Sequence, residues 1–95
     1  MTTEVHDNDD ESRYEITRDG KRVGLSEYRR RRGQVTFLHT EIDPSLRGEG
    51  LGEQLVSGAL ADVRQRGEHV IARCPYVKRF LDEHPEYQDL VDRDE

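Results

Sequence analysis

The sequence is poor in apolar residues and nearly free of sulfur. Hydrophobic residues make up 32% of its 95 residues and charged residues 38%, with no tryptophan. This length and composition leave room for one modest core in a single domain. No apolar stretch is long enough for a membrane span or a secretory signal, which favours a cytoplasmic location. One cysteine, Cys74, excludes an intramolecular disulfide framework, and no Cys/His cluster has zinc spacing, so no metal is expected.

The net charge of −6 is concentrated at the start of the chain. Acidic residues crowd there with almost nothing apolar between them: Glu4, Asp7, Asp9, Asp10 and Glu11. We therefore expect residues 1–12 to form a disordered, solvated arm and residues 13–95 to form the domain.

The run Arg29–Arg32 is the opposite feature. Consecutive arginines are compatible with nucleic-acid binding or with the solvated end of a hairpin. Because consecutive strand residues point to opposite faces, arginines in a strand make no single basic patch. The hairpin interpretation is therefore favoured, and no nucleic-acid partner is expected.

The first half of the chain has the pattern of an antiparallel meander. Apolar and polar residues alternate in three segments, at residues 13–18, 23–28 and 34–42. Turn signals separate these segments at Asp19-Gly20 and Arg32-Gly33. We expect three strands joined by two tight turns.

The second half predicts a helix, a strand and another helix. Apolar residues recur at helical spacing from about residue 50 to 66, and a short strand is expected over 69–74. Pro75 favours the start of a second helix that ends near His84-Pro85. A strand–helix–strand unit of this length normally makes a right-handed parallel crossover. The predicted fold class is therefore α/β (α+β), a mixed sheet with helices packed on it.

A glycine-rich loop, Arg47-Gly48-Glu49-Gly50-Leu51-Gly52, precedes the longer helix. Glycine lets the backbone approach a ligand, and the first N–H groups of a helix lack partners within it, so this arrangement suits a phosphate group. A P-loop needs Lys and Ser/Thr where Glu53 and Gln54 stand, and the glycine spacing does not fit the dinucleotide fingerprint. A glycine-rich turn without a ligand remains the alternative.

The remaining pattern, Arg-x-x-Gly-x-Gly, resembles the pyrophosphate loop of the GNAT acetyltransferases. His39-Thr40-Glu41 precedes it, and Cys74-Pro75-Tyr76-Val77 and His84-Pro85-Glu86-Tyr87 follow it. Together these motifs make residues 13–91 similar to the minimal single-domain subfamily of GNAT N-acetyltransferases. The resemblance implies a GNAT-like fold, use of acetyl-CoA, and acetyl transfer to an amine.

The same resemblance places the coenzyme. The pyrophosphate would lie on the loop's N–H groups, and the pantetheine arm along the end of the strand that carries His39. The coenzyme-binding residues implied in this way are Thr40, Glu41, Ile42, Arg47, Gly48, Glu49, Gly50, Leu51, Gly52 and Tyr76.

Cys74 is the first catalytic candidate. A residue before proline is extended and proline is favoured at the first helical position, so Cys74 is predicted to cap the second helix. A thiol facing a helix N-terminus has a lowered pKa. It could then accept the acetyl group transiently or donate a proton to the departing CoA thiolate. The alternative is a small core residue at the end of a strand.

His39 and Glu41 are the other catalytic candidates. Strict alternation places both on one face with Val35 and Phe37. His39 could take a proton from the incoming ammonium group near neutral pH, or it could be a hydrogen-bonded core residue. Glu41 is a second candidate base or an orienter of His39. Tyr76 could assist proton transfer, although packing is favoured.

The remaining residues of the motifs are given structural roles. His84 and Tyr87 are expected to be structural, with Tyr87 and Leu90 docking the C-terminal segment on the sheet. Lys78 and Arg79 could contact coenzyme phosphates, but a solvated helix face is favoured.

Only a turn separates the first two strands, where larger acetyltransferases have a helical segment that builds the acceptor pocket. We therefore expect an open acceptor site for an exposed lysine, including a lysine of a protein, a terminal amine or a small polyamine. A non-catalytic module that binds CoA or acyl-CoA is the alternative function. Direct transfer is slightly favoured over an acetyl-Cys74 intermediate, and the chain is expected to be a monomer or weak dimer with no membrane partner.

Overall fold

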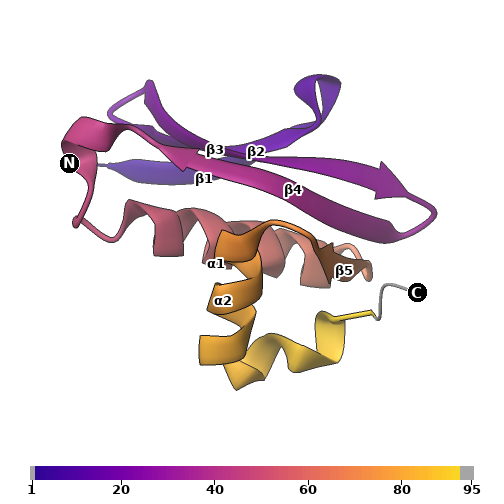
Figure 1. Ribbon diagram of the computed structural model, residues 1–95. Coiled ribbons are helices and arrows are strands. Elements are labelled where there is room, and N and C mark those ends of the chain that lie inside the picture. The colour runs from indigo at the N-terminus through magenta and orange to yellow at the C-terminus, as the bar shows by residue number, and fades with distance from the viewer. Residues whose placement is uncertain (1, 93–95) are drawn as a thin grey trace.

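The computed structural model describes residues 2–92, which form one five-stranded mixed sheet with helices packed on it (Figure 1). In Figure 1 the helices α1 and α2 lie on the same side of the long strands. The strands are β1 (Thr3–Asn8), β2 (Arg13–Arg18), β3 (Lys21–Arg31), β4 (Gln34–Ile42) and β5 (His69–Ala72). The helices are α1 (Leu51–Gln65) and α2 (Pro75–Glu83), with the 3₁₀ turns η1 (Asp9–Glu11), η2 (Pro44–Leu46) and η3 (Pro85–Leu90).

The strands are ordered β1-β2-β3-β4-β5, antiparallel up to β4, while β4 and β5 run parallel. The predicted meander and parallel crossover are thus confirmed. Both predicted turns place non-glycine residues at positive φ beside a glycine: Asp19 at 51° with Gly20 at 83°, and Arg32 at 50° with Gly33 at 76°. These conformations match the right-handed twist of the strands that they join.

The parallel pairing of β4 and β5 is short, and this creates a free strand edge. The two strands pair only from Gln34 to Phe37 on β4. The N–H groups of Arg73 and Cys74 then both donate to the Phe37 carbonyl, at 3.0 and 2.9 Å, before Pro75 starts α2. Beyond Phe37, β4 therefore continues with one edge unpaired by β5.

One hydrophobic core lies between the sheet and the helices. Its fully buried large side chains include Tyr14, Ile16 and Phe37 from the sheet and Leu51, Leu55 and Leu60 from α1. The amphipathic repeat that predicted α1 is therefore the surface that α1 buries. None of the helices between residues 2 and 92 is long and apolar enough to cross a membrane.

The prediction of a disordered arm is wrong for the segment from Thr3 to Asn8, which forms β1. The strand pairs with β2 along its whole length, and Val5 packs directly over α1 at Gly58. A Cβ on Gly58 would lie 2.8 Å from the Val5 Cβ, so the helix has a glycine where the strand crosses it. Met1 and residues 93–95 lie outside the described residues.

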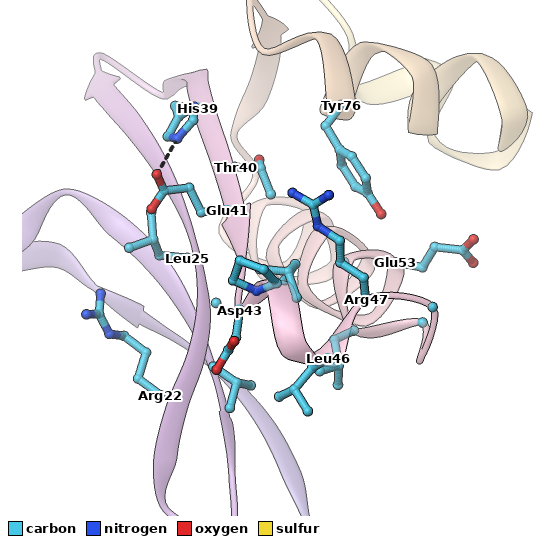
Figure 2. A pocket seen from close by; sticks show the side chains of 18 residues that line it. Arg22, Leu25, His39, Thr40, Glu41, Asp43, Leu46, Arg47, Glu53 and Tyr76 are labelled. Carbon is cyan, nitrogen blue, oxygen red and sulfur yellow. Dashed lines mark ion pairs between the residues drawn. The ribbon is translucent and has the colours of Figure 1, made fainter.

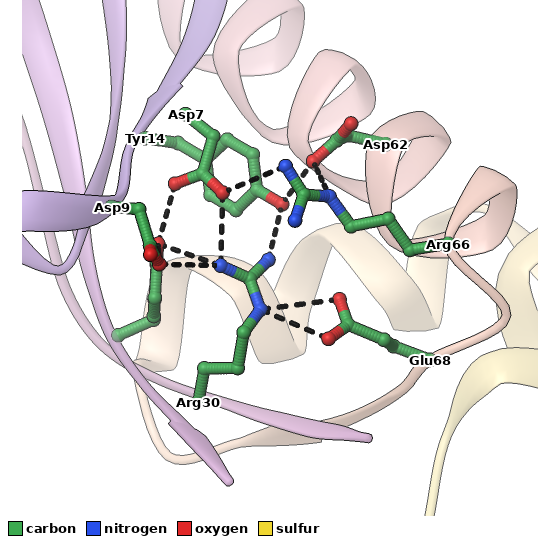
Figure 3. A network of polar contacts seen from close by, with 8 residues as sticks. Asp7, Asp9, Tyr14, Arg30, Asp62, Arg66 and Glu68 are labelled. Carbon is green, nitrogen blue, oxygen red and sulfur yellow. Dashed lines mark hydrogen bonds and ion pairs between the residues drawn. The ribbon is translucent and has the colours of Figure 1, made fainter. Parts of the chain in front are cut away.

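Two of the acidic residues at the start of the chain, Asp7 and Asp9, are paired with arginines (Figure 3). The Asp7 carboxylate accepts hydrogen bonds from Arg30 at 2.9 Å and from Tyr28, and forms an ion pair with Arg66 at 3.2 Å. Glu68 pairs with the Arg30 Nε at 3.0 Å. The expectation of disorder rested on the number of acidic residues in this segment. It took no account of the arginines, distant in sequence, that pair with them.

The arginine run alternates as predicted. Arg30 turns toward the helices and enters the network, whereas Arg29 and Arg31 are exposed and Arg32 occupies the turn. Although burial opposes its charge, the hydrogen bonds to Glu68 and Asp7 raise the pKa of Arg30. The run therefore forms the end of a hairpin, and Arg30 is the member of the run that is held in place by hydrogen bonds to several side chains.

Candidate active site

The glycine loop connects η2 to α1 and leaves the start of the helix uncapped. Gly48 and Gly50 have φ values of 86° and 77°, a region that favours glycine. Gly50 is the N-cap of α1, and no side chain accepts a hydrogen bond there. The first N–H groups of α1 are therefore free, at the positive end of the helix dipole. This local structure is what a phosphate site requires.

A groove of about 1070 Å³ runs from this loop along β4 (Figure 2). It is bordered by the ends of β3 and β4, by the loop, and by α2 through Tyr76. The predicted site residues that line it are His39, Thr40, Glu41, Ile42, Arg47, Gly48, Gly50, Leu51, Gly52 and Tyr76. The groove thus gathers residues that are far apart in the sequence.

Glu49 is an exception among the predicted coenzyme residues, because it does not line the groove. Its carboxylate lies 2.8 Å from Arg18 Nη1 on β2. Arg47, in contrast, is exposed and forms no ion pair with the residues that the structure describes. The loop therefore presents an unpaired cation to the groove while its one carboxylate is neutralised by a neighbouring strand.

A β-bulge in β4 changes the faces on which the candidate catalytic residues lie. Glu27 pairs with His39 and Tyr28 with Phe37, so Leu38 is an extra residue without a partner. An extra residue reverses the alternation that follows it. The prediction that His39 and Glu41 share a face with Val35 and Phe37 is therefore wrong.

His39 and Glu41 instead lie on the face of the sheet that carries Leu25 of β3, while Thr40 lies on the side of α1 and α2 (Figure 2). Their side chains are 53% and 63% exposed, and His39 Nε2 lies 3.0 Å from Glu41 Oε1. The alternative of a buried core histidine is thus excluded. The pair is accessible to a molecule that approaches the uncovered side of the sheet.

Cys74 is the N-cap of α2, with φ of −74° and ψ of 123°, as Pro75 predicted. Its thiol, however, makes no capping hydrogen bond to the helix, which corrects the expectation that the thiol faces the helix N-terminus. Cys74 is only 2% exposed and does not line the groove. Its Sγ lies 3.4 Å from the Thr40 Oγ1, so Thr40 separates the thiol from the groove.

Tyr76 covers the start of α1 from the opposite side of the groove. A Cβ on Gly52 would lie 2.3 Å from the Tyr76 hydroxyl, so only glycine leaves room for the ring in this position. Burial raises the pKa of Tyr76, and the charges of Glu53 and Glu83 raise it further. The phenol is therefore neutral at physiological pH.

Comparisons with known proteins agree with this geometry. A family model described as GCN5-related N-acetyl-transferase matches residues 13–90. The chain belongs to the GCN5-related N-acetyltransferase family. It is accordingly an N-acetyltransferase, the enzyme class that its resemblance to the family implied.

Solved structures show the same fold. A GCN5-like protein from Staphylococcus aureus superposes with a TM-score of 0.72 at 23% identity, covering 97% of this chain and 90% of that one. The ribosomal-protein-S18-alanine N-acetyltransferase from Escherichia coli gives a TM-score of 0.57 at 20% identity, over 61% of this chain and 38% of that one. No curated protein matches the sequence significantly.

The C-terminal motif of the acetyltransferase is structural, as predicted, but His84 and Tyr87 pack on α2 rather than on the sheet. The segment that follows docks on the core through Leu90 and on β5 through Val91. His84 Nδ1 lies 2.8 Å from the Phe80 carbonyl oxygen, and its ring stacks on Phe80 at 3.9 Å between centroids. Tyr87 packs against the same ring, and Arg64 lies over Tyr87. The cation of Arg79 pairs with Glu83 at 3.6 Å and does not line the groove, in agreement with a solvated helix face.

Sequence reasoning missed the residues that support the site from β2 and β3. Arg18 neutralises Glu49, Ser26 contacts Thr40 at 2.9 Å, and Arg22 and Leu25 line the uncovered side of the groove. The β-bulge at Leu38 sets the register between β3 and β4 beyond Phe37, and no sequence motif predicts this bulge. Among residues 2–92, no group of His, Cys, Asp and Glu is arranged to hold a metal ion.

Proposed function

We propose that the protein transfers the acetyl group of acetyl-CoA to a primary amine at an open site. The observation that carries the proposal is the groove itself. It joins an uncapped helix N-terminus, the free edge of β4 and the exposed His39–Glu41 pair in one continuous space. A phosphate site, a strand edge for an extended chain and a proton acceptor are the three parts that this reaction needs.

The coenzyme would bind on the helix side of β4. The free N–H groups at the start of α1 and the unpaired Arg47 favour the diphosphate. The pantetheine arm would follow the free edge at Thr40 and Ile42. Glu49 does not repel the diphosphate in this arrangement, because Arg18 holds its carboxylate.

The amine would approach from the other face of β4. The negative charge of Glu41 attracts an ammonium group, and His39 with Glu41 can accept its proton. No helix among residues 2–92 covers this face, so an exposed lysine, a terminal amine and a small polyamine can all reach it (Figure 1). The acceptor class is thus set by accessibility rather than by a closed pocket.

Direct transfer is the mechanism that this geometry supports best. The amine nitrogen attacks the thioester carbon, the C–S bond breaks, and its electron pair leaves with the sulfur of CoA. The buried Cys74 thiol does not line the groove, so it is badly placed to receive the acetyl group.

A pair of glycine variants tests the coenzyme site. Gly50 and Gly67 flank the two ends of α1, both have positive φ, and a Cβ on either meets no atom within 4 Å. Gly50→Glu and Gly67→Glu therefore carry the same strain and charge, but only the first puts a carboxylate at the helix N-terminus. Calorimetric titration with acetyl-CoA should show binding to wild type and Gly67→Glu and none to Gly50→Glu. Equal affinity of both variants would contradict the proposed site.

A further inference from the structure

A chain of three polar groups, of which two are buried, links the interior of the sheet to the groove. The Ser26 Oγ on β3 lies 2.9 Å from the Thr40 Oγ1 on β4, and the same oxygen lies 3.4 Å from the Cys74 Sγ. Ser26 is 0% exposed and Cys74 is 2% exposed, whereas Thr40 lines the groove. Thr40 is therefore the only member of the chain that a bound molecule can touch.

One arrangement of the hydrogens in this chain uses the hydrogens of both buried groups. A hydroxyl or thiol has one hydrogen to donate, and a threonine oxygen can accept two hydrogen bonds. For Ser26 and Cys74, Thr40 is the only side-chain partner among residues 2–92. Either atom of each pair could be the donor, and because buried polar hydrogens are nearly always used, the favoured arrangement is the one in which both groups donate to the Thr40 oxygen. The hydrogen of Thr40 is then left to point into the groove.

We propose that Thr40 donates this hydrogen bond to the sulfur of the bound acetyl thioester, and that Ser26 and Cys74 are positioning residues that act through Thr40. The inference rests on the proposed function, since it assigns a role to one residue of the same groove. Thr40 lies between His39 and Glu41 in the sequence but on the opposite side of β4 (Figure 2). Thr40 would thus contact the leaving sulfur from one side of β4, and the His39–Glu41 pair would contact the incoming amine from the other side.

The step balances without covalent participation of the protein. The bond between the amine nitrogen and the acetyl carbon forms as the bond between that carbon and sulfur breaks, and the electron pair stays on sulfur. The Thr40 O–H stabilises the developing thiolate and keeps its proton. One ammonium proton passes to the His39–Glu41 pair before attack. The second proton, which the nitrogen loses as the amide forms, goes to the CoA sulfur, which leaves as the thiol. A fixed donor aimed at a developing negative charge requires no reorganisation during the reaction.

Variants of Thr40 give the first test. Thr40→Val removes the hydroxyl at nearly constant shape and should lower kcat by about 10²–10³-fold, the usual loss of one such donor, with little change in the acetyl-CoA dissociation constant. Thr40→Ser keeps the hydroxyl and should restore most of kcat. The matched control is Thr36→Val in the same strand, outside the groove, which should leave kcat unchanged.

Variants of the positioning residues give the second test. Cys74→Ala and Ser26→Ala should each lower kcat by up to about tenfold, the worth of one neutral hydrogen bond. Cys74→Ser should recover activity, because a serine hydroxyl also donates to Thr40. In the Thr40→Val background, Cys74→Ala should have no further effect, since the group through which it acts is gone.

Three results would overturn the inference. The first is a kcat of Thr40→Val close to that of wild type. The second is a decrease in kcat from Cys74→Ala that is equal in the presence and absence of the Thr40 hydroxyl. The third is an acetyl mass increment on Cys74 during turnover. The last would show that Cys74 reacts directly. If wild type itself binds acetyl-CoA without acetylating any amine, the proposed function fails instead, so the two failures are distinguishable.

Discussion

Stability at alkaline pH should report directly on the network that holds β1 to the rest of the fold. Tyr14 and Tyr28 are 1% and 3% exposed. The Tyr14 hydroxyl donates to Asp62 at 2.7 Å, and the Tyr28 hydroxyl donates to Asp7. Burial raises the pKa values of both phenols, and the carboxylates that accept their hydrogen bonds raise them further. Both tyrosines should therefore stay neutral in the folded protein well above pH 10.

The sign and size of the change in unfolding free energy with pH follow from the difference between the tyrosine pKa values in the folded and unfolded protein. A tyrosine in the unfolded chain loses its proton near pH 10. Because the folded-state pKa values are raised, the stabilisation is complete below pH 10 and is lost as pH rises above it. At pH values where both tyrosines are ionised in the unfolded chain but neutral in the folded protein, the free energy of unfolding should fall by about 1.4 kcal/mol per pH unit for each tyrosine. For the pair the slope is about 2.7 kcal/mol per pH unit.

Urea unfolding followed by circular dichroism between pH 8 and about pH 11.5 measures this slope. The Tyr14→Phe variant should lose about half of it, and the variant that also carries Tyr28→Phe nearly all of it. At neutral pH each substitution should cost about 1–3 kcal/mol, because the partly buried Asp62 or the buried Asp7 loses a donor. A slope that is equal in wild type and in the double variant would refute the reasoning, since the network would then not control these protons.

Other predictions concern packing and chemistry. Phe37→Ala should cost about 3–5 kcal/mol in urea unfolding, because the ring is fully buried between sheet and helices. Gly58→Ala should destabilise by about 1–3 kcal/mol through overlap with Val5, against a gain of about 1 kcal/mol in helix propensity; a net stabilisation would mean that β1 does not cross α1 there. The variant with both His39→Ala and Glu41→Gln should lose about 10² or more in kcat while still binding acetyl-CoA, and an undiminished kcat would exclude the pair as the base.

Much of the fold could be predicted from local patterns. The strand over 34–42 was predicted with the bounds that the structure gives, and the longer helix within one residue at each end. The apolar residues of these segments recur with a clear period, and Asp-Gly, Pro and Gly mark where the segments begin and end. The short strand ends at Ala72 rather than at Cys74, because the next two N–H groups turn to the Phe37 carbonyl.

The errors concern contacts between distant segments. The strand β1 is held by Arg30, Arg66 and a glycine on α1, none of which is near it in sequence. The face that carries His39 depends on an extra residue, Leu38, whose presence is decided by the pairing with β3. The glycine loop, in contrast, was predictable because its chemistry is contained in six consecutive residues.

The release of CoA thiol from acetyl-CoA, followed with and without an amine, tests the central claim most directly. The protein should be incubated with acetyl-CoA and, separately, a lysine peptide, a peptide with only an α-amine, and spermidine. The account predicts thiol release that depends on at least one of these amines, saturates with acetyl-CoA, and is absent in Gly50→Glu but present in Gly67→Glu. Thiol release that is independent of every amine, or equal in the two glycine variants, would contradict it.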